Sequence, residues 1–319
     1  MNCERDGREC PCSKAVKIQS MIKKNAIKEA YLQLEPMLKQ VVTNWDQYRK
    51  CMSGAGPASV CKGEAGALYK AVRMLEDWAG TYNMEPLDKM KGSMVLFTFG
   101  QSNSANYGQG HYKSQNEVYD YYEGKLFHAE DPLFGSGGEG ATVWTRLGDK
   151  IIDAGMAERV TIVPIGVGGV RVGAWAKGGE LYERLVNTVE SLKKNGVELT
   201  YILWHQGETD NILNTTKEDY VKMFETIREV FRSRGIEAPI VVARASYHPA
   251  CLDENHGNST EVRDAQKELA DKYEDIYPGP DTDLLDRTWQ RGDGVHFSVL
   301  GQDLHAEMWL KSLKKVKIK

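Results

Sequence analysis

The chain of 319 residues is longer than most single compact domains, which predicts one large domain with an appendage, or two domains. Its hydrophobic fraction of 41% and charged fraction of 27% are typical of a soluble globular protein. The net charge of −4 argues against a general affinity for nucleic acid. No apolar run approaches the roughly 20 residues of a membrane span.

The first residues do not form a signal peptide, and we interpret them as the mature end of a secreted chain behind an added methionine. Cysteines crowd into this part of the chain, which indicates disulfides and an oxidising compartment, secreted or periplasmic. A reduced cytoplasmic protein is the alternative. The spacing of Cys10-Pro-Cys12 is too short for a zinc pair. The crowded cysteines are Cys3, Cys10, Cys12, Cys51 and Cys61, and their pairing stays open, although a Cys51–Cys61 bridge would close a loop.

Residues 1–90 form a predicted helical appendage without recognisable chemistry. Apolar residues recur at three- and four-residue spacing between residues 15 and 52, with Pro36 breaking or kinking the pattern into two helices. A further helix is predicted over residues 64–79. This appendage is expected to pack on the main domain, to bind a partner or to wall one side of a cleft.

From Met94 the pattern changes to alternating strands and helices, which makes residues 91–319 the main domain. The alternation predicts an α/β fold with a mostly parallel sheet covered on both faces. The stretch from Gly100 to Gly140 is interpreted as a long functional surface loop. Predicted strands cover 94–99, 160–165, 199–205, 239–243 and a short run around Leu284; predicted helices begin near Trp144 and cover 180–194, 217–234, 260–273 and 299–313.

Two clusters of small and polar residues follow the first two strands. The first presents Ser102 at the carboxyl edge of the sheet, where a hydroxyl becomes a nucleophile if a histidine takes its proton. The second, from Gly166 to Trp175, contains Gly168-Gly169, whose backbone N–H groups can approach a ligand closely. It matches neither nucleotide-binding glycine pattern, so no nucleotide cofactor is expected.

The third and fourth clusters carry titratable groups. Residues 204–210 read Trp-His-Gln-Gly-Glu-Thr-Asp at the end of the third strand. Asp293 and His296 stand three residues apart just before the last helix, where the carboxylate can orient the imidazole. The order Ser, Asp, His is that of the α/β-hydrolases, but their Gly-x-Ser-x-Gly elbow does not occur here.

Together the four blocks resemble the SGNH hydrolase superfamily. These are residues 100–103 (Gly-Gln-Ser-Asn), 168–169, 204–210 and 293–296 (Asp-Gly-Val-His). The closer similarity is to the sialate O-acetylesterase-like branch, which includes acetylxylan esterases of carbohydrate esterase family six, over about residues 92–315. The resemblance implies a three-layer α/β/α, flavodoxin-like fold and a serine esterase without metal or other cofactor.

The resemblance also implies roles for single residues. Ser102 would attack the acyl carbonyl, His296 would carry the proton, and Asp293 would orient His296. The oxyanion hole would comprise the N–H of Ser102, the N–H of Gly169 (Gly168 less so) and the side-chain amide of Gln206. The candidate substrate contacts are Gln101, Asn103, Arg171, Trp175 and Glu208, although Glu208 and Asp210 are also interpreted as braces of their loop.

Arg171 stands where relatives often have a Thr-Ser type pair after the double glycine. Two hypotheses are kept: a surface salt bridge, or recognition of a carboxylate on an acidic sugar. Aromatic residues are candidates for stacking on sugar rings or for ordinary packing: Trp175, Trp289, Tyr107, Tyr112, Tyr119, Tyr121 and Tyr122.

The sequence therefore predicts a carbohydrate O-acetylesterase acting on an acetylated xylan-type polysaccharide or a sialic acid-type sugar. Three alternatives remain: an SGNH lipase or thioesterase on longer acyl chains, a metallohydrolase, or a sugar-binding module without catalysis. The metallohydrolase would use His205, Glu208, Asp210 and His296, which lack a helical His-Glu-x-x-His spacing. The sugar, the acetyl position and the oligomeric state stay open.

Overall fold

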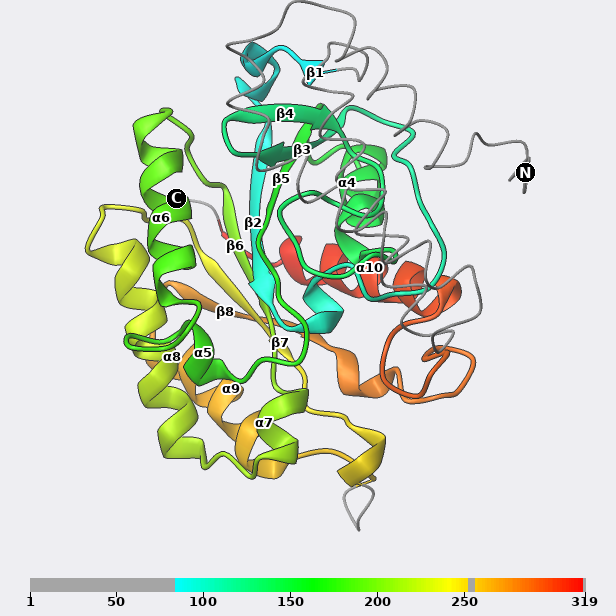
Figure 1. Ribbon diagram of the computed structural model, residues 1–319, viewed down its shortest axis with the longest axis vertical. Helices are drawn as coiled ribbons and strands as arrows, with labels where there is room; N and C mark the ends of the chain where they lie inside the picture. The colour runs from blue at the N-terminus through cyan, green and yellow to red at the C-terminus, as the bar shows by residue number, and fades with distance from the viewer. Residues whose placement is uncertain (1–83, 252–255, 318–319) are drawn as a thin grey trace, which may run out of the picture. The chain divides into compact units, whose positions relative to one another are not determined.

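The computed structural model describes residues 84–251 and 256–317 (Figure 1). The chain divides into two compact units at the Met84–Glu85 boundary, and the second unit is described here. The predicted N-terminal helices and the five crowded cysteines lie outside the described residues.

The centre of the second unit is a sheet with the strand order β1-β4-β3-β5-β2-β6-β7-β8. All pairs from β3 to β8 along this order are parallel, whereas β3 and β4 are antiparallel. The strands are β1 Met84–Glu85, β2 Met94–Gly100, β3 Val118–Tyr122, β4 Lys125–His128, β5 Val160–Pro164, β6 Tyr201–His205, β7 Ile240–Arg244 and β8 Ile276–Asp281.

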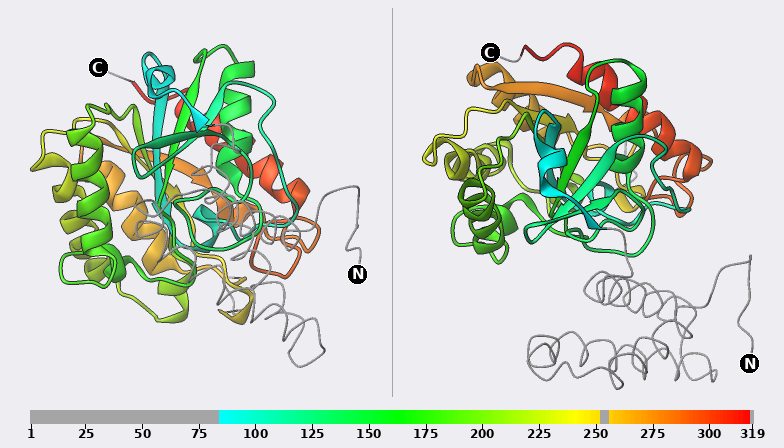
Figure 2. Two further views of the ribbon diagram at one scale, coloured as in Figure 1. Left: turned by 45° about the horizontal axis from the view of Figure 1, so that its top comes forward. Right: turned by 90° about the horizontal axis from the view of Figure 1, so that it is seen from above.

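Helices cover both faces of the sheet and make three layers (Figures 1 and 2). The helices are α4 Val143–Asp153, α5 Val172–Trp175, α6 Tyr182–Lys194, α7 Glu208–Ile212, α8 Lys217–Arg232, α9 Thr260–Lys272 and α10 Val299–Leu313. Short 3-10 turns are η1 Leu87–Met90, η2 Ser102–Ser104, η3 Pro249–Cys251 and η4 Thr282–Leu284. This confirms the predicted three-layer α/β/α fold.

The central strand β2 is buried on both faces, which explains its unbroken apolar sequence. Val95, Phe97 and Phe99 pack in the core shared with α5, α6, α8 and α9. Met94 and Leu96 face the second core, formed with α4 and α10. Because successive side chains of a strand point to opposite faces, one apolar run supplies two cores.

The structure corrects two predictions between the main elements. The stretch from Gly100 to Gly140 is more than a surface loop, because it contains the β3–β4 hairpin, with Tyr119 paired to His128. The last strand, β8, lies before Leu284, which belongs to the 3-10 turn η4. Among the described residues, no helix has the length and apolar character needed to cross a membrane.

Candidate active site

The candidate site lies at the carboxyl ends of β2, β5 and β6, the three neighbouring strands at the centre of the sheet. From β2 the chain continues to β3, β4 and β5 on one side, then crosses to β6, β7 and β8 on the other. Ligands of open α/β sheets bind where the direction of winding reverses in this way. The blocks around Ser102, Gly169 and Gln206 follow these three strands.

Ser102 begins the short turn η2 directly after β2. Its side chain is 5% exposed, and no other described residue is hydrogen-bonded to its hydroxyl. The backbone at Gly100 has φ +135°, and a Cβ there would lie 2.0 Å from the carbonyl oxygen of His205. Glycine is therefore required for β2 to pass β6 closely and turn Ser102 out of the strand.

Of the double glycine, Gly168 packs against Tyr107, whereas Gly169 is open. A Cβ on Gly168 would lie 2.4 Å from the ring of Tyr107, while a Cβ on Gly169 would meet nothing within 4 Å. Gly169 is exposed with φ +68°. Neither its N–H nor that of Ser102 donates to another described residue, so both are available to a ligand oxygen.

Asp293 and His296 form a hydrogen-bonded pair on one tight turn. The Nδ1 of His296 lies 2.7 Å from Oδ2 of Asp293. The other carboxylate oxygen accepts the backbone N–H groups of Val295 and His296 at 2.9 and 2.6 Å. Partial burial acts to raise the pKa of Asp293, but these N–H donors and the imidazole lower it below the usual range. The ionised Asp293 thus fixes the orientation of His296.

Two contacts bring this turn to the Ser102 segment. Asn103 donates its side-chain amide to the carbonyl oxygen of Val295 at 3.3 Å. The ring of Tyr107 stacks on His296, with the ring centroids 5.5 Å apart. The residues beside the serine therefore hold the residues beside the histidine, although 192 positions separate Asn103 from Val295.

The structure does not support the prediction that Gln206 is an oxyanion donor. Its side chain is fully buried, and its nitrogen lies 2.5 Å from Asp210 Oδ2, 3.1 Å from Gln101 Oε1 and 3.1 Å from the carbonyl oxygen of Val170. Two N–H groups already face three acceptors. The Gln206 side chain therefore joins the segments after β2, β5 and β6 and has no hydrogen left for a substrate.

Four of the predicted substrate contacts also face inward. Trp175 is fully buried, donates to the carbonyl oxygen of Gly100 at 3.2 Å and packs edge-on against Phe99. Gln101 accepts the N–H groups of Gly207 and Thr209 at 3.2 and 3.1 Å. Asn103 donates to Oε1 of the buried Glu208 at 2.8 Å. All four side chains hold the loops together, and none of them points outward as a ligand contact would.

The proposed metal ligands have different partners. Glu208 lies 3.5 Å from Nε2 of His205, whereas Asp210 accepts the N–H of Val172 at 2.8 Å. Across residues 84–251 and 256–317, His, Cys, Asp and Glu form no group of three able to hold a metal ion. Glu208 and Asp210 instead brace the loop after β6.

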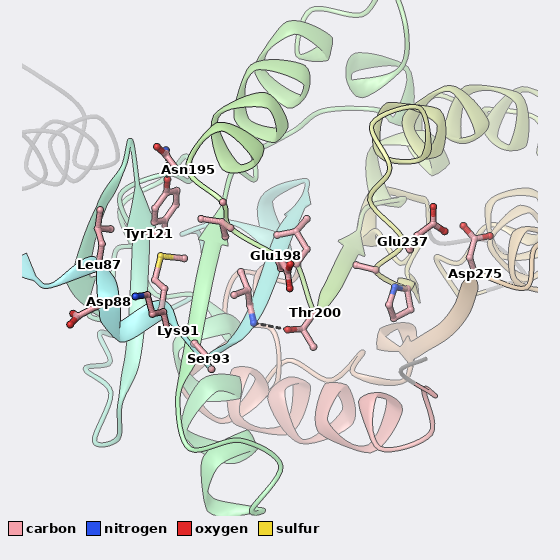
Figure 3. Close-up of a pocket in the computed structure, with 18 of the residues that line it drawn as sticks. Leu87, Asp88, Lys91, Ser93, Tyr121, Asn195, Glu198, Thr200, Glu237 and Asp275 are labelled. Carbon is pink, nitrogen blue, oxygen red and sulfur yellow. Dashed lines mark hydrogen bonds between the residues drawn. The ribbon is translucent and has the colours of Figure 1, made fainter.

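A cavity of about 1020 Å³ opens at the opposite edge of the sheet (Figure 3). It lies at the amino ends of the strands, where Ser93 precedes β2 and Thr200 precedes β6. Its rim includes carboxylates from three segments, Glu198, Glu237 and Asp275. None of the four sequence blocks contributes to it, so it is separate from the candidate active site.

Comparison with known proteins agrees with this geometry. A family model described as "Carbohydrate esterase, sialic acid-specific acetylesterase" matches residues 93–313. The chain belongs to this carbohydrate esterase family. A probable carbohydrate esterase of Arabidopsis thaliana is 41% identical over 51 residues, which are 16% of this chain and 20% of that protein. The match thus spans about a fifth of this curated relative's length.

The solved structure of the Arabidopsis relative shares the fold of this chain. The X-ray structure of the same Arabidopsis protein has a TM-score of 0.56 at 21% identity, covering 70% of this chain and 99% of that one. The psychrotrophic esterase EstA from Pseudoalteromonas sp. has a TM-score of 0.46 at 15% identity, covering 69% and 97%.

Few of the predicted sugar contacts are exposed. Arg171 is exposed at the start of α5, and its guanidinium forms no ion pair with another described residue. The side chains of Trp289 and Tyr107 are 54% and 39% exposed. By contrast, Tyr119 and Tyr121 are core residues, Tyr122 stacks on Phe134, and Tyr112 is bonded to Asp149.

Two residues near the candidate site were assigned no role from the sequence. The segment of His248 lies against the turn that carries Asp293 and His296 (residues 291–297, called here the catalytic turn because of its candidate residues), where a Cβ on Gly294 would lie 3.6 Å from the ring of Pro249. Burial lowers the pKa of His248, helped by the nearby His296 and Arg291 and opposed by Glu208. Arg291 is 1% exposed and donates to the carbonyl oxygen of Val295 in this turn at 2.6 Å. A lone arginine two residues before Asp293 carries no sequence signal for this role.

Proposed function

We propose that this protein is a serine esterase that removes O-acetyl groups from carbohydrates. The observation that carries the proposal is the Asp293–His296 pair, hydrogen-bonded at 2.7 Å and tied through Val295 and Asn103 to the segment that presents Ser102. Membership of the carbohydrate esterase family supports a sugar ester as the substrate.

In the proposed reaction, the Ser102 hydroxyl oxygen attacks the acetyl carbonyl while Nε2 of His296 takes its proton. Asp293 stabilises the resulting imidazolium through Nδ1–H. The N–H groups of Ser102 and Gly169 bind the oxyanion of the tetrahedral intermediate. When the intermediate collapses, His296 returns the proton to the leaving sugar oxygen. A water molecule then attacks the acetyl-enzyme by the same route and releases acetate.

The first test is hydrolysis of 4-nitrophenyl acetate, butyrate and octanoate by the wild type and by Ser102→Ala. We expect acetate to be preferred, and the variant to lose activity by at least about 1,000-fold because the nucleophile is gone. A fluorophosphonate should label the wild type and not the variant. Equal activity of the two proteins would contradict the serine mechanism, and no activity in either would favour the sugar-binding module.

A second candidate function is an esterase that acts on longer acyl chains. It is favoured by apolar side chains exposed on both sides of the catalytic turn in the sequence: Leu284, Trp289, Val299 and Leu300. Preference for butyrate or octanoate in the same series would select this function.

For the sugar itself, we propose an acidic one, read by Arg171. Sialic acids and uronates carry a carboxylate, which an arginine can bind through two parallel hydrogen bonds. Arg171 follows the proposed oxyanion donor Gly169 by two residues, is exposed and is free of ion pairs with the described residues. The family description, which names sialic acid, points to the same class.

Arg171→Ala should therefore lower kcat/KM by about tenfold or more on O-acetylated sialic acid, because a charged hydrogen-bonded pair is lost. Activity on a neutral acetylated xylo-oligosaccharide should hardly change. Lys177→Ala, which removes another exposed cation after the same strand, is the matched control. Equal loss on both sugars, or no loss on either, would refute recognition of the carboxylate.

A further inference from the structure

Arg291 is a buried cation that binds backbone instead of a carboxylate. Its side chain is 1% exposed. Nε donates to the carbonyl oxygen of Leu285 at 2.5 Å, Nη1 to that of Val295 at 2.6 Å, and Nη2 to that of Thr282 at 3.0 Å. No described carboxylate lies within 4.0 Å of the guanidinium, and a buried charge needs close polar partners. Carbonyl oxygens of the segments that follow β8 are these polar partners.

The guanidinium also lies against two aromatic rings. Its carbon is 4.3 Å from the ring centroid of Phe297 and 5.0 Å from that of Tyr247. Phe297 directly follows the proposed base, and Tyr247 follows β7. One side chain therefore contacts the segments after β7 and β8 and the catalytic turn.

The catalytic turn closes around Arg291. The backbone of Arg291 pairs with that of Phe297 in an isolated antiparallel bridge. Within it, Gly294 N–H donates to the carbonyl oxygen of Arg291 at 3.0 Å, and Gly292 N–H to that of His296 at 3.1 Å. Asp293 and His296 stand on the turn so formed, while the Arg291 side chain bonds the carbonyl of Val295 between them.

The Val295 carbonyl oxygen links the segment of the proposed base, His296, to the segment of the proposed nucleophile, Ser102. It accepts from Arg291 at 2.6 Å and from Asn103, the neighbour of Ser102, at 3.3 Å. Asn103 is held in turn by Glu208 at 2.8 Å. The position of the catalytic turn relative to the Ser102 segment therefore depends on two hydrogen bonds, both accepted by the Val295 carbonyl oxygen.

We propose that Arg291 is a positioning residue of the esterase, whose guanidinium holds the Asp293–His296 turn in register with Ser102 through the Val295 carbonyl. The inference rests on the proposed function, because it assigns His296 as the base. Arginine suits the role because its planar fork reaches three carbonyl groups at once. A lysine would keep the charge but carries its donors on one nitrogen, so it would release at least one segment.

The experiment compares Arg291→Lys with the wild type in steady-state hydrolysis of 4-nitrophenyl acetate. Near-UV circular dichroism measures the folded fraction of each protein, and the rates are divided by the concentration of folded protein. We expect kcat to fall about 10- to 100-fold, because a small misplacement of a catalytic group costs this much. KM should stay within about twofold, because the binding groups are untouched. Labelling of Ser102 by a fluorophosphonate should slow by the same factor as kcat.

Arg232→Lys is the matched control. Arg232 is also largely buried, with 10% of its side chain exposed. It donates to the carbonyl oxygens of Ile236 and Ala238 at 2.5 and 3.0 Å and to Asp275, but at the opposite edge of the sheet. It should lose stability and keep kcat. Wild-type kcat in Arg291→Lys, or equal loss of kcat in both variants, would overturn the proposal.

A second variant, Arg291→Ala, is assayed with and without millimolar guanidinium chloride. Recovery of kcat at constant KM in Arg291→Ala, with kcat of Arg232→Ala unchanged by guanidinium, is the expected result. Absence of rescue in folded Arg291→Ala would count against a positioning role. Failure of the proposed function looks different: wild-type protein would then not be labelled at Ser102 at all.

Discussion

At the scale of single residues, Glu208 shows how a buried charge supports the site. Burial alone would raise the pKa of its carboxyl group. The nearby imidazole of His205, 3.5 Å away, the hydrogen bond from Asn103 and the positive charge of Arg291 outweigh burial and lower it to about 2. In the folded protein Glu208 therefore stays ionised down to a lower pH than it does in the unfolded chain.

This difference predicts a pH dependence of stability. The folded-state pKa lies below the ordinary glutamate value of 4.5, so the contribution of Glu208 to stability is complete above pH 4.5 and is lost as the pH falls toward 2. The loss amounts to about 3 kcal/mol. Glu208→Gln should unfold at lower urea concentration at pH 7 and show a flatter dependence between pH 4.5 and 3.

Urea unfolding of both proteins across this range measures the effect. Glu198→Gln, which changes an exposed carboxylate at the other edge of the sheet, serves as the control and should follow the wild type. If the free energy of unfolding fell equally with pH in wild type and Glu208→Gln, the Glu208 carboxylate would not be the source of this acid sensitivity.

Sequence reasoning found the residues whose chemistry is local. Asp293 and His296 are three positions apart on one turn, so the sequence alone predicts their pairing. The sequence did not distinguish a sugar contact from a core residue at Trp175, because an aromatic residue beside a strand end has the same sequence signature whether it faces the ligand or the core. The direction of each side chain depends on partners far along the chain, such as Asn103 for Glu208.

At the scale of elements, helix α4 depends on a carboxylate from outside itself. Asp131 is fully buried and accepts the N–H of Thr142 at 3.2 Å and the hydroxyl of Thr145 at 2.7 Å. It also lies 3.5 Å from the buried guanidinium of Arg146. The N-cap residue Thr142 makes no side-chain cap of its own, so Asp131 supplies the acceptor that helix starts need.

Asp131→Ala should therefore lower the free energy of unfolding by about 3 kcal/mol, because it leaves two donors and one cation without their acceptor. Chemical unfolding at pH 7 measures the change. Glu158→Ala, in the exposed loop after α4, should stay within about 0.5 kcal/mol of the wild type. A loss of that small size for Asp131→Ala would mean that water replaces the carboxylate.

The helices of the main domain were predictable as elements because their apolar spacing is long and regular. The β3–β4 hairpin was missed because its strands are only five and four residues long within an irregular stretch rich in Gly, Tyr, Asn and Ser, and because it is stabilised by the neighbouring strand β5. Strand β8 contains Pro278, Gly279 and Pro280. Such a strand forms at the edge of a sheet, where fewer N–H donors are needed, and its sequence alone indicates a turn.

At the scale of the whole molecule, the order of the strands decides where the site forms. Alternating elements predicted a parallel sheet, but not that β2 would lie between β5 and β6. This arrangement places the segments that carry Ser102 and Gly169 after two neighbouring strands, β2 and β5, and no local pattern could reveal this. The enclosure of Arg291 by segments after β7 and β8 likewise follows from the complete sheet.

The long separation between Asn103 and Val295 has a consequence for the growing chain. On the ribosome, the nucleophile's strand emerges among the first of this unit, and the histidine emerges nearly 200 residues later. If the proposed chemistry holds, a nascent chain cannot be acylated efficiently until its last strand and catalytic turn have docked. Turnover then reports that synthesis and folding of this unit are complete.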